Sequence, residues 1–322
     1  METFGPLNSR ILVPLDGSDL ATNAIPVARA LASPGSTLIL CRIVPESRRL
    51  DDGGAAPTPA VADAWREAEA ALRAQAARIQ PTADVRAEIV VEAGEPGECI
   101  VGVAKDRSAG MIVLSSHGRG AGGRLLFGSV ADFVTRNAPM PVVLIHPTDE
   151  QTPAARAVRR LVVPLDESPL AHQAIPVAAA LAKRRRLPVL LLAAADPTRV
   201  DSPLAGYAAA FSERVYDDLE SSLKPDALGE LERSGARLMR EGVVATWRLL
   251  SGPAARVIPA VLSAGDLVVV ASQRLDRVER WWRGSLAEEL IQSGVAPVMV
   301  VGVTPTPAAV DKLATVESVA HA

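Results

Sequence analysis

Aromatic residues are scarce in this chain, and their scarcity limits both its cores and its partners. Phe, Trp and Tyr together make up 3% of the 322 residues, whereas hydrophobic residues as a whole make up 48%. The cores must therefore be built from Val, Leu, Ile and Ala, which favours buried parallel sheets whose strands are short aliphatic runs. The lack of aromatic stacking platforms disfavours single-stranded nucleic-acid binding.

The chain also has few cysteines, a small net charge and no long apolar segment, and each of these features excludes a class of protein. The only two cysteines, Cys41 and Cys99, lie within aliphatic segments, so we interpret them as buried hydrophobic residues and expect no disulfide or metal framework. A net charge of −3 creates no field that would attract DNA or anionic membranes. No apolar run reaches the roughly 18 residues of a membrane helix, and no signal peptide is recognisable, so we expect a cytoplasmic protein.

An internal repeat is the most informative feature of the sequence. The segment VPLD at residues 13–16 returns at 163–166, and AIPVARALA at 24–32 returns as AIPVAAALA at 174–182. Gly128-Ser129 returns as Gly284-Ser285, so the offset between the copies drifts only from 150 to 156 residues. Such a small drift indicates duplication of one unit. We predict a first copy at residues 1–150, a second copy at 151–303 and a polar tail at 304–322.

Each copy alternates aliphatic strands with helices. Strands are predicted at 11–15, 37–44, 85–92, 111–115 and 141–146, with helices at 18–32, 62–79, 96–108 and 129–136, and in the second copy strands at 161–165, 188–194, 243–250, 266–271 and 297–301. This alternation predicts an α/β fold of two tandem doubly wound, Rossmann-like domains, each a five-stranded parallel sheet with helices on both faces. Ligands of such sheets bind beyond the carboxyl ends of the strands where strand order reverses. We therefore expect functional residues just after the first and fourth strands.

A glycine-rich loop follows the fourth strand of the first copy. Gly118, Gly120, Gly122 and Gly123 lie in it, and Gly128-Ser129 then begins a helix. Glycines leave backbone amides unshielded, and the first amides of a helix attract phosphate, so phosphate binding is preferred over a mobile surface loop. The dinucleotide fingerprint is rejected because it belongs after a first strand. The Walker motif is rejected because no Lys-Ser/Thr follows the glycines.

The loop spacing resembles that of ATP-binding universal stress proteins, which carry G-x2-G-x9-G-[S/T]. The first copy has Ser115-x2-Gly118-x9-Gly128-Ser129, and the turn Asp16-Gly17-Ser18 after the first strand is also typical of that family. The resemblance extends over both copies and nearly the whole chain. The departure from the family pattern is Ser115, which stands where the family has its first glycine.

The resemblance implies an ATP site in the first copy, made of three groups of residues. Those on the ribose and adenine side would be Pro14, Leu15 and Asp16, with Ile43 or Val44 lining the adenine pocket. Those flanking the nucleotide would be Leu114 and Ser115, and those holding the phosphates would be Gly118, Gly128, Ser129 and Val130. Helix capping is the alternative role for Asp16, but Ser18 is the better-placed cap.

The second copy departs further from the family pattern. Its loop begins Ala271-Ser272-Gln273-Arg274 and lacks the loop glycines, while Glu167 replaces Gly17 beside Asp166. We therefore expect no nucleotide in the second copy.

Taken with the resemblance, these features predict an ATP-binding stress-response regulator with little or no turnover. ATP is the expected ligand, and Mg²⁺ can accompany it, although the sequence holds no metal site of its own. The alternatives are a structural interaction module without nucleotide and an ATP-using enzyme, which would need a further catalytic motif. The resemblance also implies that residues 141–146 pair with 297–301 to form an intramolecular pseudo-dimer, and that two chains can form a homodimer. Neither nucleic acid nor membrane is an expected partner.

Overall fold

The structure is a computed structural model that describes residues 7, 9–44, 59–79, 84–115, 128–146, 157–166, 168–196, 213–273 and 286–303. The first copy contains β1 (Arg10–Pro14), α1 (Asp19–Thr22), α2 (Ala24–Leu31), β2 (Ser36–Val44), α3 (Pro59–Ile79), β3 (Val85–Ala93), α4 (Pro96–Asp106), β4 (Met111–Ser115), α5 (Ser129–Asn137) and β5 (Val142–Ile145). The second contains β6 (Arg160–Pro164), η2 (Ala171–Gln173), α6 (Ala174–Arg185), β7 (Val189–Ala195), α8 (Glu213–Arg240), β8 (Ala245–Ser251), α9 (Ala254–Val261), β9 (Asp266–Gln273), α10 (Leu286–Ser293) and β10 (Val298–Val303). The predicted tail, residues 304–322, lies outside the described residues.

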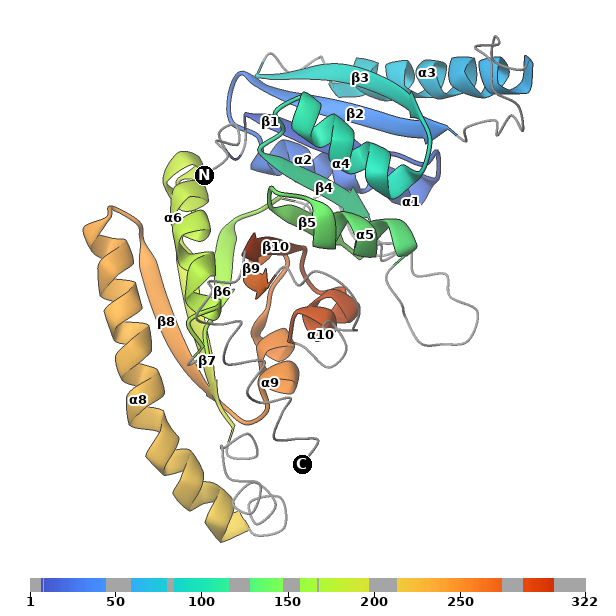
Figure 1. Cartoon of the computed structure of the whole chain (residues 1–322). Coiled ribbons are helices and arrows are strands. Elements are labelled where there is room, and N and C mark those ends of the chain that lie inside the picture. The colour runs from blue at the N-terminus through green and yellow to red at the C-terminus, as the bar shows by residue number, and fades with distance from the viewer. Residues whose placement is uncertain are drawn as a thin grey trace.

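The strands of both copies join into one sheet of ten strands, in the order β3-β2-β1-β4-β5-β10-β9-β6-β7-β8. Within each copy the neighbouring strands are parallel, and of the strand pairs in the described residues the central β5–β10 pair alone is antiparallel. Figure 1 shows the two copies side by side with β5 and β10 adjacent at the centre. The predicted α/β fold is confirmed, with two five-stranded parallel halves fused edge to edge.

Helices cover both faces of the sheet, as predicted. One core layer lies under α2, α3, α6 and α8, and the other lies under α4, α5, α9 and α10. Alternate residues of a strand serve the two layers, so that Ile11 and Val13 of β1 face the first layer and Leu12 faces the second. The largest fully buried side chains of the described residues are all Ile, Leu or Met, as the shortage of aromatics requires.

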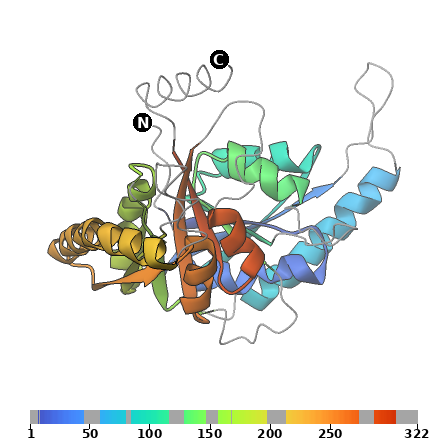
Figure 2. The ribbon, with the colours of Figure 1, turned by 90° about the horizontal axis from the view of Figure 1, so that it is seen from below.

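The β5–β10 contact makes the chain an intramolecular pair. Val143 lies opposite Met299, which confirms the predicted pairing of residues 141–146 with 297–301. Pairing removes two aliphatic strand edges that would otherwise be exposed. Because the pair is antiparallel, the strands of the two copies run in opposite directions, and their carboxyl ends lie on opposite sides of the sheet. Helices α3 and α8 lie at opposite ends of the molecule (Figure 2).

The prediction of one continuous helix over residues 18–32 was wrong. α1 ends at Thr22 and α2 begins at Ala24. The physical reason is Pro26, which has no N–H to donate to the Thr22 carbonyl and whose ring clashes with it. The second copy repeats this break, because Pro176 follows the short helix η2 in the same way.

Candidate functional site

The carboxyl ends of β1 and β4 are neighbours at the point where strand order reverses. The chain leaves β1 through α2 toward β2, and it leaves β4 through α5 toward β5, on opposite sides and opposite faces. Ligands of doubly wound sheets bind where the connections diverge in this way. The structure therefore brings the predicted residues after β1 and at the end of β4 together at one edge.

The turn after β1 is organised by Asp16 and Ser18. One carboxylate oxygen of Asp16 accepts hydrogen bonds from the backbone N–H of Ser18 (2.9 Å) and from its hydroxyl (2.7 Å). The Ser18 hydroxyl accepts from the backbone N–H of Ala21 (3.2 Å) and so caps α1, as predicted. The exposed carboxylate of Asp16 is thus held in one orientation at the edge of the sheet.

Ser115, at the end of β4, has a buried hydroxyl with no acceptor or donor opposite it in the described structure. The residue is 6% exposed, and its Oγ makes no hydrogen bond to any residue that the structure describes. Leaving a buried polar group unsatisfied costs about 1–3 kcal/mol, so such groups in a fold call for an explanation. The position is the one where this sequence departs from the glycine of the family pattern.

Helix α5 begins at the same edge without a side-chain cap. Its N-cap is Gly128, and no side chain hydrogen-bonds to the first amides among the residues described. Ser129 is exposed and Val130 half-buried, and a Cβ built on Gly128 would meet no atom within 4 Å. The first backbone N–H groups of a helix have no intrahelical partner, so this end can accept an anion. The predicted phosphate-loop residue Gly118 lies outside the described residues.

The apolar residues of the predicted site belong largely to the core. Leu15 and Leu114 are each 5% exposed, Val44 is 3% exposed, and Pro14 is half-buried at the end of β1. The Val44 carbonyl accepts a hydrogen bond from the backbone N–H of Gly94 (3.1 Å). A ligand at this edge would therefore meet mainly the backbone of these residues.

Sequence reasoning missed Arg42, near the end of β2. Its guanidinium lies against Gly17, where a Cβ would come within 3.0 Å of the central carbon and both terminal nitrogens. Gly17 has φ +89°, a left-handed conformation that also favours glycine. The available signal was a charged residue inside a strand whose other residues are uncharged, since charged residues are rarely buried without a reason.

Comparison with known proteins identifies the family. The model of the universal stress protein family matches residues 8–146 and 157–302, once for each copy. The chain belongs to the universal stress protein family. Two universal stress proteins of Mycobacterium tuberculosis are 30% identical over 203 residues and 32% identical over 193 residues. These alignments cover 63% and 60% of this chain, and the chain spans only 62% and 61% of the length of those relatives.

Solved structures support the fold. A universal stress protein from Archaeoglobus fulgidus superimposes with a TM-score of 0.66 over 92% of this chain and 98% of its own, at 18% sequence identity. At that identity the likeness concerns the fold alone. It extends over both universal stress protein copies, which agrees with the two matches to the family model.

The two cysteines have different surroundings: Cys41 is buried and Cys99 is half-buried. Burial, with smaller effects from neighbouring charges, raises the pKa of the Cys41 thiol to about 12. The Cys99 thiol faces the carbonyl of Ala93 at 3.7 Å. Within the described ranges, no three His, Cys, Asp or Glu side chains are grouped to hold a metal ion, and no helix there combines the length and apolarity of a membrane span.

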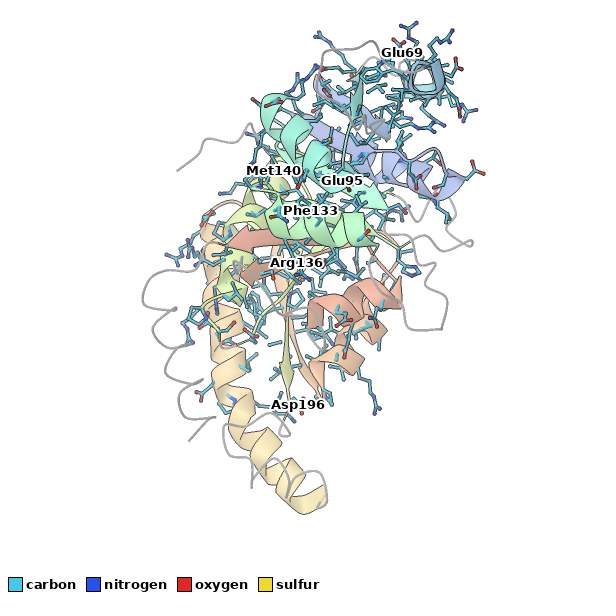
Figure 3. The ribbon with its side chains drawn as sticks, turned by 45° about the vertical axis from the view of Figure 1, so that its right-hand side comes forward. Glu69, Glu95, Phe133, Arg136, Met140 and Asp196 are labelled. Carbon is cyan, nitrogen blue, oxygen red and sulfur yellow. The ribbon has the colours of Figure 1, made fainter. Side chains whose placement is uncertain are left out.

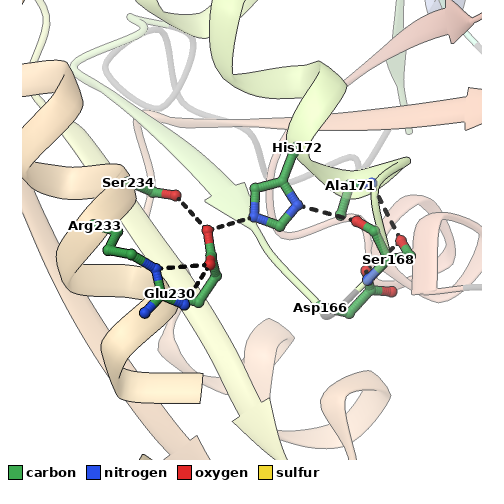
Figure 4. Close-up of polar contacts among 7 residues, drawn as sticks. All are labelled: Asp166, Ser168, Ala171, His172, Glu230, Arg233 and Ser234. Carbon is green, nitrogen blue, oxygen red and sulfur yellow. Dashed lines mark hydrogen bonds and ion pairs between the residues drawn. The ribbon is translucent and has the colours of Figure 1, made fainter. Parts of the chain in front are cut away.

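The corresponding turn of the second universal stress protein copy is tied to α8 (Figure 4). Asp166 and Ser168 repeat the arrangement of Asp16 and Ser18, with the Ser168 amide 2.9 Å from the Asp166 carboxylate. The two ring nitrogens of His172 then lie 3.0 Å from the Ser168 carbonyl and 2.8 Å from a carboxylate oxygen of Glu230 on α8.

Glu230 is the centre of this contact. Arg233 donates to its other carboxylate oxygen at 2.7 Å, and the Ser234 hydroxyl donates at 3.1 Å to the oxygen that also faces His172. Hydrogen bonds from Arg233 above all, and then from His172 and Ser234, lower the pKa of Glu230. No sequence motif indicates this cluster, because His172 and Glu230 are 58 residues apart.

Proposed function

We propose that the first copy binds ATP and that the protein regulates a stress response by binding nucleotide rather than by catalysis. The observation that carries the proposal is the buried hydroxyl of Ser115, which has no partner among the described residues and lies at the same end of the sheet as the start of α5, where no side-chain cap is described. The α5 amides and helix dipole would hold phosphate oxygens, and the Ser115 hydroxyl would gain an acceptor. The family loop spacing from Ser115 to Ser129 supports a nucleotide over another anion.

The two copies are not equivalent in this proposal. The second copy lacks the loop glycines, and its β6 turn is held by the His172–Glu230 contact. We therefore expect one tight nucleotide site per chain. Turnover should be very slow, since the first-copy sequence offers no histidine or carboxylate pattern typical of a base that activates water.

Ser115→Ala tests the proposal directly. Removing an unsatisfied buried hydroxyl should leave the fold as stable as before or more so. ATP affinity should nevertheless fall, by roughly tenfold for one lost hydrogen bond. Gly128→Val should act more strongly by placing a side chain where phosphate approaches. Gly102→Val on α4 is the matched control, because a Cβ there also meets no atom within 4 Å.

Fluorescent-ATP binding and titration calorimetry, with circular dichroism to check folding, give the readout. We expect a stoichiometry of one, weakened binding by Ser115→Ala and Gly128→Val, and unchanged binding by Gly102→Val. Wild-type protein that binds no nucleotide, or two equivalent sites per chain, would contradict the proposal. Equal affinity of wild type and Gly128→Val would remove the phosphate-loop assignment.

A further inference from the structure

Arg42 is a mostly buried cation with little to neutralise it. Its side chain is 21% exposed, and among the described residues the one charged partner recorded for it is Glu67 on α3, at 4.0 Å. The Glu67 side chain is itself 77% exposed, and no hydrogen bond reaches the Arg42 guanidinium from the described part of the chain. A guanidinium carries five N–H donors, and burying such a charge without acceptors is unfavourable. An arrangement of this kind fits a cation whose acceptor is a ligand.

The position of Arg42 relates it to the proposed nucleotide site. Leu15 donates its N–H to the Cys41 carbonyl (2.7 Å), so Arg42 lies beside the point where the chain leaves β1. Strand β1 separates β2 from β4, so the ends of β2 and β4 are about 10 Å apart at the usual strand spacing. Arg42 belongs to the α3 side of the sheet, whereas α5 begins on the other side. A nucleotide with its phosphates at α5 would reach Arg42 with its base.

The second copy has neither the arginine nor the glycine of this arrangement. Ile11 pairs with Leu38 in the first copy and Leu161 with Val189 in the second, so Ala193 is the counterpart of Arg42. Glu167 stands at the position of Gly17. The glycine that leaves room for the guanidinium and the guanidinium itself are therefore present together in one copy and absent together in the other. The second copy loses one positive charge and gains one negative charge at this edge.

We propose that Arg42 recognises the base end of the nucleotide and is a principal cause of the difference between the two copies. The inference rests on the proposed function. The guanidinium donates to acceptor atoms of the base or ribose and offers a flat face on which a purine ring can stack. Gly17 favours this placement, because a Cβ at that position would lie 3.0 Å from the guanidinium, which would have to shift, and because its φ of +89° is strained for other residues.

The test compares ATP and adenosine as ligands of the wild type, Arg42→Ala and Arg42→Lys. Arg86→Ala is the matched control, because Arg86 is exposed near the amino end of β3 and carries the same charge. We expect Arg42→Ala to weaken both ligands by a similar factor, roughly tenfold to hundredfold. Arg42→Lys should recover only part of the affinity, since it keeps the charge but loses the planar fork. Arg86→Ala should bind as the wild type does.

The outcomes separate this inference from the proposed function. Wild-type protein that binds neither ligand would overturn both. Wild-type binding with no loss in Arg42→Ala would overturn the role of Arg42 and leave the ATP site standing. A loss for ATP alone, with adenosine unaffected, would place Arg42 at the phosphates and overturn its assignment to the base. Circular dichroism of each variant shows whether a loss of affinity reflects a loss of fold.

Discussion

The Arg160–Asp266 ion pair joins a buried carboxylate to a partly exposed guanidinium, and it offers a test of how burial sets the strength of a polar contact. Asp266, at the start of β9, is 3% exposed, and its two carboxylate oxygens accept from Arg160 at 2.8 and 2.6 Å. The backbone N–H of Ser263 donates to it as well, at 2.8 Å. Arg160 is 32% exposed and reaches water. Removing Asp266 therefore leaves a guanidinium that water can solvate, whereas removing Arg160 leaves a buried carboxylate.

The expected magnitudes follow from that difference. Breaking a buried pair by deleting one partner costs about 3–5 kcal/mol, mostly because a charge is left buried and unpaired. Asp266→Ala leaves a guanidinium that water can solvate, so we expect a loss of about 3 kcal/mol. Arg160→Ala leaves a buried carboxylate that, among the described residues, keeps the Ser263 N–H as its donor, so we expect a loss of about 4–5 kcal/mol. Glu88→Ala in the first copy breaks the more exposed contacts of Glu88 with Arg10 and Arg107 and should cost about 1 kcal/mol.

Urea denaturation, followed by circular dichroism, measures these free energies of unfolding. The order of the variants is the decisive result, because it does not depend on the absolute scale. If Asp266→Ala were more damaging than Arg160→Ala, burial of the carboxylate would not be the cause of the loss. If both cost less than Glu88→Ala, the pair would contribute no more than a surface contact, and the reasoning would be refuted.

Two further predictions concern α8. Gly235→Ala should destabilise by about 1–3 kcal/mol in urea denaturation, because its Cβ would lie 2.4 Å from the Trp247 ring. Gly229→Ala on the same helix should be neutral or stabilising, since its nearest neighbour is a flexible arginine tip at 3.3 Å, and equal effects of the two would contradict this explanation. Hydrogen bonds, chiefly from Arg233, lower the pKa of Glu230 in the folded protein. The contribution of this carboxylate to the free energy of unfolding should therefore be complete above about pH 4.5 and be lost as the pH falls through the lowered pKa. The melting-temperature difference between wild type and Glu230→Gln should therefore shrink from pH 7 to pH 3, and a constant difference would refute it.

Local close packing between helices was also beyond sequence reasoning. Phe133 projects from α5 toward α4 (Figure 3), and a Cβ on Gly97 would come within 2.6 Å of its ring. The glycine in PGEC was interpretable as a helix start but not as a contact with a residue 36 positions later. Such approaches depend on how two helices settle on the sheet, which their separate sequences do not specify.

The sequence by itself determined the duplication, the parallel direction of the strands within each copy and the aliphatic character of the core. These follow from local signals: a repeat with an almost constant offset, alternation of strand and helix patterns, and the shortage of aromatics. The Ser18 cap was likewise predictable, because a cap depends on residues three apart. Family resemblance supplied the pairing of the two last strands.

Only the tertiary structure decided which polar side chains meet. Arg42 covers Gly17, His172 reaches Glu230, and the Ser115 hydroxyl is left without a partner among the described residues. These outcomes depend on strand register and on which helix covers which strand end, and no periodicity along the chain encodes them. Burial then sets the free energy of each group. A charge or hydroxyl that costs little in water becomes costly when it is buried without a partner, and it can then favour the binding of a ligand that supplies one.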